Sequence, residues 1–134
     1  MKCVCVLIWD RNYKVLSVSR KNNPQDKGLV GGKVESNESE ITALIREVKE
    51  ETGLDVLNFK LIYTDTDDNN NLVETYICKC EGKISTQEKG VVEFVDYSEL
   101  LKGSFRNYNL NLLDIFINNF DRNIINEYIS HIRN

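Results

Sequence analysis

The sequence predicts an α+β fold in which short strands surround one chemically distinctive helix. A helical pattern covers residues 37–53, and further helical segments follow near the C-terminus. Strands and helices do not alternate strictly, so we expect an α+β or mixed-sheet sandwich rather than a series of βαβ units. The stretches with strand character, separated by polar turns, are residues 2–9, 15–19, 56–65, 72–80 and 91–95.

Length and composition indicate one domain. The chain has 134 residues, of which 41% are hydrophobic and 28% charged, and these values exclude intrinsic disorder. No repeat or low-complexity linker divides it, so we expect residues 1–134 to form a single domain. No apolar run approaches the ~18 residues of a membrane span. Val4 to Trp9 is too short for a signal peptide, so we expect a cytoplasmic protein.

In the first part of the chain, residues 2–9 are expected to form a strand and Val15 to Ser19 its hairpin partner. Residues 21–28 form a polar loop in this interpretation. The helix then begins near Asn37, which caps it, with Glu40 three residues later in the position of a capping box. Gly53 ends the helix in the left-handed conformation that glycine favours.

In the second part, two strands at 56–65 and 72–80 are joined by a turn over Asp67 to Asn71. Asp96 caps a brief helix after the strand at 91–95, and a last helix runs from Tyr108 to Phe120. Residues 122–132 extend that helix or form another. Their apolar residues pack on the same domain or form a dimer contact, so a monomer and a homodimer are both compatible with the sequence.

The four cysteines form two Cys-x-Cys pairs, Cys3 with Cys5 and Cys78 with Cys80. Residues two apart in a strand point to the same face, whereas zinc sites usually space their thiolates more widely. We therefore expect buried or half-buried free thiols, with a metal site or a disulfide as alternatives.

The helix over 37–53 has two distinct faces. Ile41, Leu44, Ile45 and Val48 share a stripe that we expect to face the core. The second face carries three carboxylates at i, i+3 and i+4, which repel one another. They are Glu47, Glu50 and Glu51. They are either a solvated acidic face, partly compensated by neighbouring bases, or the ligands of a divalent cation.

The net charge supports the second alternative. The chain has 17 basic and 21 acidic residues, a formal net charge of −4, which argues against a basic surface for duplex nucleic acid. Residues 35–51 hold six acids and two bases, while the remainder carries 15 of each. The whole formal charge therefore lies in the segment that contains the three carboxylates.

A longer motif surrounds this helix. Gly32 is followed after five residues by Glu38, and after seven more by Arg-Glu-Val-Lys-Glu-Glu-Thr-Gly-Leu at 46–54. Residues 32–54 match every fixed position of the Nudix box, G-x5-E-x7-R-E-U-x-E-E-x-G-U, where U is aliphatic. The chain therefore resembles the Nudix hydrolases, and its length allows the resemblance to cover all of it.

This resemblance implies an α/β/α sandwich around a mixed sheet and the hydrolysis of a nucleoside diphosphate linked to another moiety. It implies Mg²⁺ as the cofactor, with Mn²⁺ as a substitute. By family analogy Glu50 and Glu51 bind the metal, and Glu47 is a further ligand or the base that activates water. The Gly31 carbonyl is an expected extra ligand.

Other positions of the box have supporting roles by the same analogy. Arg46 orients the carboxylates through a charge-assisted hydrogen bond and belongs with them to the catalytic group. Glu38 supports the loop, and Gly32 and Gly53 are structural.

The chain is most similar to the MutT-type branch, which converts nucleoside triphosphates to monophosphates and pyrophosphate and removes oxidised guanine nucleotides. Glu88 corresponds to a loop ligand of this branch, with Glu93 as the competing residue. Asn109, four residues after Phe105, is placed to bind a base, although a helix cap is an equal alternative. Arg20 is placed to meet a phosphate or a base.

Leu29 borders the expected nucleotide pocket, where this sequence departs from the branch: an aromatic residue often occupies that region, and Val30 replaces a frequent proline. These departures affect positions that border the nucleotide pocket and leave the metal-binding positions of the motif intact. Alternatives are a diphosphatase for a nucleotide sugar, a dinucleotide or a capped RNA 5′ end, and a non-catalytic domain that senses a nucleotide. In each case the expected partner is a small nucleotide, with no membrane involved.

Overall fold

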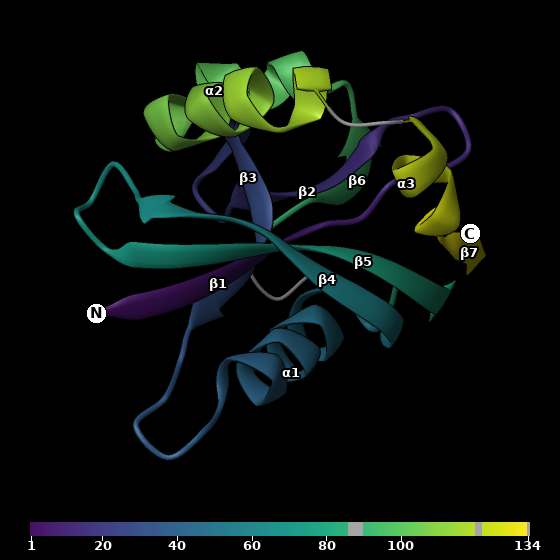
Figure 1. Cartoon of the computed structure of the whole chain (residues 1–134), viewed down its shortest axis with the longest axis horizontal. Coiled ribbons are helices and arrows are strands. Elements are labelled where there is room, and N and C mark those ends of the chain that lie inside the picture. Colours follow the sequence, from purple (N-terminus) through teal and green to yellow (C-terminus); the bar gives the residue numbers. More distant parts are fainter. Residues whose placement is uncertain (86–89, 120–121, 134) are drawn as a thin grey trace.

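A mixed β-sheet runs through the computed structural model, which describes residues 1–85, 90–119 and 122–133 (Figure 1). The strand order is β4-β5-β1-β3-β2-β6, and β7 pairs with β5 outside this path. The strands described are β1 (Lys2–Leu7), β2 (Val15–Arg20), β3 (Asn23–Lys33), β4 (Asp55–Thr66), β5 (Leu72–Lys83), β6 (Val92–Val95) and β7 (His131–Arg133). The helices are α1 (Glu40–Thr52), α2 (Arg106–Ile115) and α3 (Arg122–Glu127), with 3-10 turns η1 (Tyr97–Lys102) and η2 (Ile117–Asn119).

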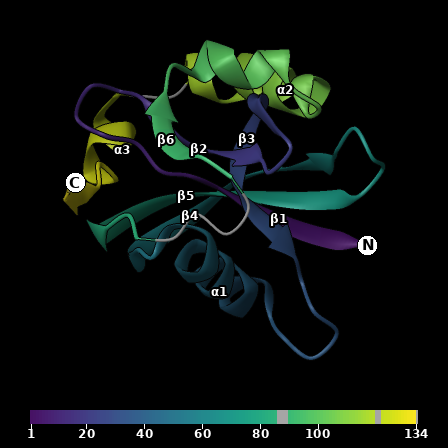
Figure 2. The same cartoon turned by 180° about the vertical axis from the view of Figure 1, so that it is seen from behind.

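The helices cover opposite faces of the sheet. Figures 1 and 2 show α1 on one side and α2 on the other, with α3 near the C-terminus. One cluster of buried apolar side chains joins the sheet to α1, for example through Val4 and Leu44. A second cluster joins the other face to α2 and α3 and includes Leu112 and Ile125. The α+β prediction is confirmed.

The predicted hairpin between the first two strands is wrong except next to the turn that joins them. Trp9 pairs with Val15, and the Leu16 amide donates to the Ile8 carbonyl at 2.9 Å. Beyond this point β2 pairs with β3 and β6, whereas β1 pairs with β3 and β5. The strands separate because the long β3 pairs with β2 along its first half and with β1 along its second.

The polar loop predicted over 21–28 is also wrong for most of its length, because β3 begins at Asn23. The side chains of Asn23 to Gln25 are exposed, which explains why hydrophobicity gave no strand signal there. The backbone is held by pairing with β2, with a register shift between Ser19 and Arg20.

Helix α1 begins later than predicted. Ser39 rather than Asn37 is the N-cap, since its Oγ accepts a hydrogen bond from the Thr42 amide at 3.1 Å. Gly53 ends the helix at φ +80°, as predicted. The predicted core stripe is wrong at Ile45, which is 48% exposed, because the buried face is rotated toward Ala43, Leu44 and Val48.

The second half of the chain follows the predictions more closely. The β4–β5 hairpin and the β6 strand lie where predicted, but the last long helix is shorter, ending at Ile115. Asp96 precedes η1 without a side-chain capping bond. The tail forms α3 and then β7, a strand that was not predicted, and Ile125 and Tyr128 pack into the chain's own core.

The four cysteines are free thiols, as predicted, with Cys78 and Cys80 buried and the other two half-buried. Burial raises the pKa of Cys5 to about 12. Within the described residues, no helix is long and apolar enough to span a membrane.

Candidate active site

Two neighbouring glycines of β3 stand where a side chain would not fit. At Gly31 a Cβ atom would come within 2.2 Å of the Val4 carbonyl oxygen on the neighbouring strand. At Gly32 it would come within 2.4 Å of Glu47 Oε1. The first glycine therefore permits strand pairing, and the second leaves space for a carboxylate directly against the backbone.

Two of the three predicted carboxylates are buried. Glu47 is 6% exposed and Glu51 is 5% exposed. Burying a charged group is costly unless it is hydrogen-bonded. Glu51 Oε1 accepts a hydrogen bond from the Gly31 amide at 2.8 Å, and Glu47 Oε1 accepts one from Arg46 Nη1 at 2.9 Å. The solvated acidic face considered above is therefore wrong for these two residues.

Arg46 and Glu38 fasten the preceding loop to α1. Arg46 Nε and Nη2 donate to the two oxygens of Glu38 at 3.1 and 2.6 Å, and Nη2 also donates to the Lys33 carbonyl at 3.0 Å. This bidentate pair holds the pKa of Glu38 below its ordinary value and raises that of Arg46. Glu38 also accepts from the Glu35 amide at 2.9 Å. This arrangement is consistent with the supporting role expected for Glu38.

Glu50 is the solvent-facing member of the set. Its side chain is 52% exposed, and Arg46 Nη1 lies 3.3 Å from its Oε2. In the part of the chain that the structure describes, no three His, Cys, Asp or Glu side chains converge as a complete metal site.

The donor chemistry nevertheless fits a hard cation: three carboxylates and the Gly31 carbonyl lie in one region, and Mg²⁺ completes its octahedron with water. Because Gly32 has no side chain, the Glu47 carboxylate lies directly against the β3 backbone beside Gly31, and this placement supports the fit.

Two cavities adjoin this region and share Leu29 and Phe105 on their walls. The larger, of 530 Å³, is bordered by Glu51 and by the basic side chains of Arg20 and Lys21. The smaller, of 180 Å³, is bordered by Gly31 and Gly32, by apolar side chains and by the polar residues Asp67, Asn71 and Asn109. The structure therefore brings Arg20 and Leu29 into one cavity, and Leu29 and Asn109 into the other.

The remaining predicted site residues are placed as follows. Arg20 Nε lies 3.0 Å from Asp26. Although burial opposes its charged form, hydrogen bonds from Ser104 and the charge of Arg20 hold the pKa of Asp26 below its ordinary value. Asn109 is 2% exposed and its Nδ2 donates to the Leu100 carbonyl at 3.4 Å. Glu93 pairs with Lys27 at 3.7 Å and borders neither cavity, while Glu88 lies outside the described residues.

Sequence reasoning missed the contribution of the β4–β5 turn. Asp67 and Asn71 border the smaller cavity, and Asp68 accepts from the amides of Asn107 and Tyr108 at 3.1 and 2.9 Å. These contacts join segments about 40 positions apart in the sequence. No local pattern indicates them, since the turn has an ordinary polar composition.

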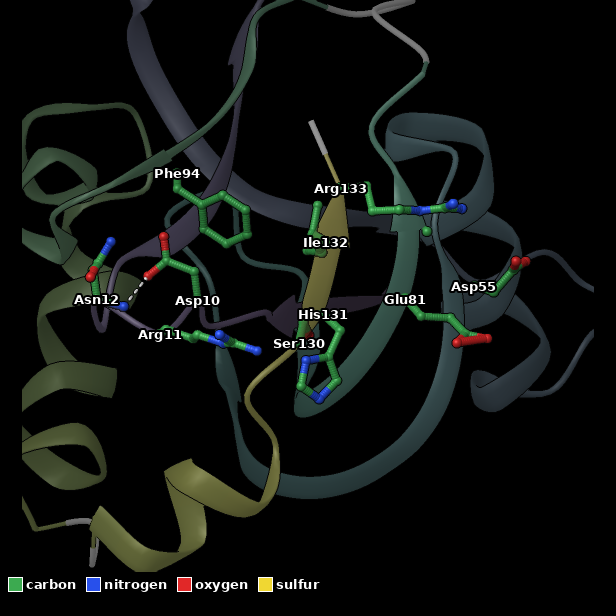
Figure 3. A pocket seen from close by; sticks show the side chains of 11 residues that line it. Asp10, Arg11, Asn12, Asp55, Glu81, Phe94, Ser130, His131, Ile132 and Arg133 are labelled. Carbon is green, nitrogen blue, oxygen red and sulfur yellow. Dashed lines mark hydrogen bonds between the residues drawn. The ribbon is translucent and has the colours of Figure 1, made fainter.

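The largest of the described cavities lies elsewhere. Figure 3 shows this 760 Å³ cavity around β7, between the β1–β2 turn and the ends of β4 and β5. Arg11, His131 and Arg133 border it together with Asp10, Asp55 and Glu81, so its charges are mixed. It contains none of the predicted site residues. The carboxylates of α1 instead lie near the 530 Å³ and 180 Å³ cavities, which we take as the candidate site.

Comparisons with known proteins identify the family and the fold of this chain. The NUDIX domain family model matches residues 1–114. The fold resembles that of MutT from a study of the Aliivibrio salmonicida and Vibrio cholerae proteins, with a TM-score of 0.72, 21% identity, and coverage of 90% of this chain and 100% of that one. It also resembles the NUDIX domain of Shewanella oneidensis NrtR, complexed with ADP ribose, with a TM-score of 0.63, 19% identity, and coverage of 85% and 84%.

A curated relative provides sequence similarity over a shorter range. The ADP-ribose pyrophosphatase of Methanocaldococcus jannaschii is 50% identical over 50 residues. This match covers 35% of the present chain and only 29% of the relative's length.

Proposed function

Because this chain belongs to the Nudix hydrolase family, which acts on nucleoside diphosphate derivatives, we propose that its substrate is a nucleoside triphosphate. The products would be a nucleoside monophosphate and pyrophosphate, as in the MutT-type branch, and an oxidised purine nucleotide is a specific candidate. The observation that carries the proposal is that the carboxylate region adjoins two cavities. One contains Arg20 and Lys21 together with Asp26 and Glu51, and the smaller one combines apolar side chains with a few polar ones.

The roles of the residues follow from their surroundings. Lys21 would attract the polyphosphate, and Arg20 would do so while paired with Asp26, because these residues border the cavity that contains Glu51. Glu47, Glu50, Glu51 and the Gly31 carbonyl would hold Mg²⁺, or Mn²⁺ in its place. When bound, the metal supplies charge neutralisation on the phosphates and lowers the pKa of bound water.

The protein itself holds the carboxylates in place. Arg46 donates to Glu47 while Glu38 fixes the guanidinium, and the Gly31 amide holds Glu51. Glu47 would accept the proton of the attacking water or bind the metal directly. Glu88 or Glu93 remains the proposed extra ligand. Leu29 and Asn109 would contact the base, since both border the smaller cavity.

A panel of substrates tests this proposal. Purified protein with Mg²⁺ is incubated with canonical and oxidised nucleoside triphosphates, ADP-ribose, a nucleotide sugar and a dinucleoside polyphosphate, and the products are separated. We expect monophosphate and pyrophosphate from at least one triphosphate at a kcat/KM above that for ADP-ribose. Preferential release of AMP from ADP-ribose would contradict the proposal and favour the activity named for the curated relative. Tight nucleotide binding without turnover would instead indicate a sensor.

A further inference from the structure

The turn between β4 and β5 forms one wall of the smaller cavity together with the start of α2. Asp67 and Asn71 of the turn border this cavity, as do Phe105 and Tyr108. Asp68 connects the two segments by accepting hydrogen bonds from the amides at the start of α2. Phe105, the residue preceding α2, makes no side-chain capping bond, so the turn supplies the cap.

Tyr108, which belongs to this wall, is also held by hydrogen bonds. The Tyr108 hydroxyl lies 2.5 Å from Thr75 Oγ1, which in turn lies 2.9 Å from Cys5 Sγ. Thr75 is fully buried and Tyr108 is 4% exposed. The cavity is therefore bounded by side chains that are already held in place.

The lining of this cavity suits a ring rather than a phosphate. Its volume of 180 Å³ lies below the ~300 Å³ at which pockets begin to enclose a whole drug-sized ligand. Leu29, Val73 and Phe105 provide apolar surface, and no Lys or Arg is among the described residues that border it. A carboxylate in this lining repels phosphate and attracts N–H donors.

Asp67 has acceptor capacity that its own turn does not use. Its Oδ1 accepts from the amides of Asn69 and Asn71, both at 2.9 Å. Its Oδ2 has only a 3.5 Å contact with Asn71 Nδ2, although a carboxylate offers about four acceptor positions. The pKa of Cys3, raised mainly by burial, is raised further by the charge of Asp67, which is consistent with that charge lying near the cavity lining.

We infer that Asp67 is a specificity-determining residue of this site, and that it favours a substrate ring with neighbouring N–H donors on one edge, as in guanine-type bases. This inference rests on the proposed function for the position of the phosphates. A ring that loses one of the two donors, as hypoxanthine does, binds more weakly because the carboxylate keeps one partner fewer. A ring that presents an acceptor at this edge is disfavoured further.

Calorimetric binding of nucleoside monophosphates tests this inference without turnover. We expect GMP to bind the wild-type protein at least about 10-fold more tightly than IMP, the value of one charge-assisted hydrogen bond. In Asp67→Asn this ratio falls to about 1–3: GMP loses both contacts with the carboxylate, and IMP binds more weakly because it loses the one contact that it makes. The asparagine oxygen still accepts the two turn amides, so the turn is retained.

Asp65→Asn is the matched control. Asp65 lies near the end of β4, two residues before Asp67. It accepts a hydrogen bond from the Tyr63 hydroxyl at 2.5 Å and does not border the cavity. Its GMP-to-IMP ratio stays at the wild-type value. Equal binding of GMP and IMP by the wild-type protein overturns the inference even if Asp67→Asn does not fold.

The two proposals fail in distinguishable ways. A protein that discriminates between GMP and IMP but releases no pyrophosphate from any triphosphate supports the role of Asp67 and contradicts the proposed reaction. A protein that releases pyrophosphate, with the same ratio of kcat/KM for GTP and ITP in the wild type and in Asp67→Asn, contradicts the role of Asp67 and leaves the reaction supported.

Discussion

Replacing Gly32 by alanine should remove activity while leaving the fold intact. An added Cβ lies 2.4 Å from Glu47 Oε1 and 2.5 Å from its Cδ, whereas ordinary contact begins near 3.4 Å. The carboxylate must therefore retreat by about 1 Å. It cannot take Arg46 with it, because that guanidinium is bonded to Glu38 and to the Lys33 carbonyl.

The expected magnitude follows from this displacement. A misplacement of about 1 Å in a catalytic constellation can reduce the rate by about 10²-fold. Only the end of a flexible side chain moves, and alanine reduces the entropy of the unfolded chain, which is worth about 0.4–1 kcal/mol in favour of folding. The retreat also separates the buried Glu47 carboxylate from Arg46, which outweighs this gain. We therefore expect the free energy of unfolding to fall by about 1–2 kcal/mol, equivalent to several degrees in Tm.

Gly31→Ala is the matched comparison. Its Cβ would meet the Val4 carbonyl oxygen at 2.2 Å and the Cys5 Cα at 2.8 Å, which are backbone atoms of the paired strand. This substitution should destabilise the protein by about 1–3 kcal/mol or more. Pyrophosphate release and thermal unfolding are measured for both variants. Near wild-type activity in Gly32→Ala, or destabilisation equal to that of Gly31→Ala, would refute the reasoning.

Three further outcomes are expected. Glu38→Gln weakens the bidentate pair with Arg46, so Tm and kcat should both fall. The surface substitution Glu99→Gln is the control and should change neither, and an unchanged kcat in Glu38→Gln would contradict the supporting role of Glu38. Asp68→Ala removes the acceptor at the start of α2 and should lower the free energy of unfolding in denaturant by about 1 kcal/mol. An unchanged free energy of unfolding would show that solvent replaces Asp68 and would contradict its capping role. Because Cys78 and Cys80 are buried, and burial raises the pKa of both thiols (to about 12 for Cys80), they should react with a disulfide reagent at pH 8 only after unfolding; rapid reaction of all four thiols in the folded protein would contradict the burial.

Local patterns in the sequence predicted the local features of the fold. Gly53 ends α1 as predicted because a left-handed residue acts on its own helix. The β4–β5 hairpin was predicted because its turn and both strands are contiguous. Strand pairing between distant segments was not predictable in this way: β3 has a polar, exposed first half and is held by β2, a partner chosen by tertiary structure.

The same distinction applies to the candidate site. The spacing of Glu47 and Glu51 predicted a shared helix face, but their burial depends on β3 crossing beside them, with Gly31 donating to one and Gly32 leaving space for the other. The role of Asp67 could not be predicted, because it depends on contact between the β4–β5 turn and α2. The residues of the Nudix box predicted a metal-dependent hydrolase, and the fold adds the 180 Å³ cavity that would contain the base of the substrate.

A magnesium titration of hydrolysis tests the central claim, that the carboxylates of α1 hold a divalent cation used for hydrolysis. Pyrophosphate release from the preferred triphosphate is measured against Mg²⁺ concentration for the wild type, Glu51→Gln and the control Glu81→Gln, with circular dichroism to confirm folding. We predict saturable activation of the wild type and the control, no activity without a divalent metal, and a loss of about 10²-fold or more in Glu51→Gln. Full activity in chelator, or an active Glu51→Gln protein with unchanged dependence on Mg²⁺, would contradict the account.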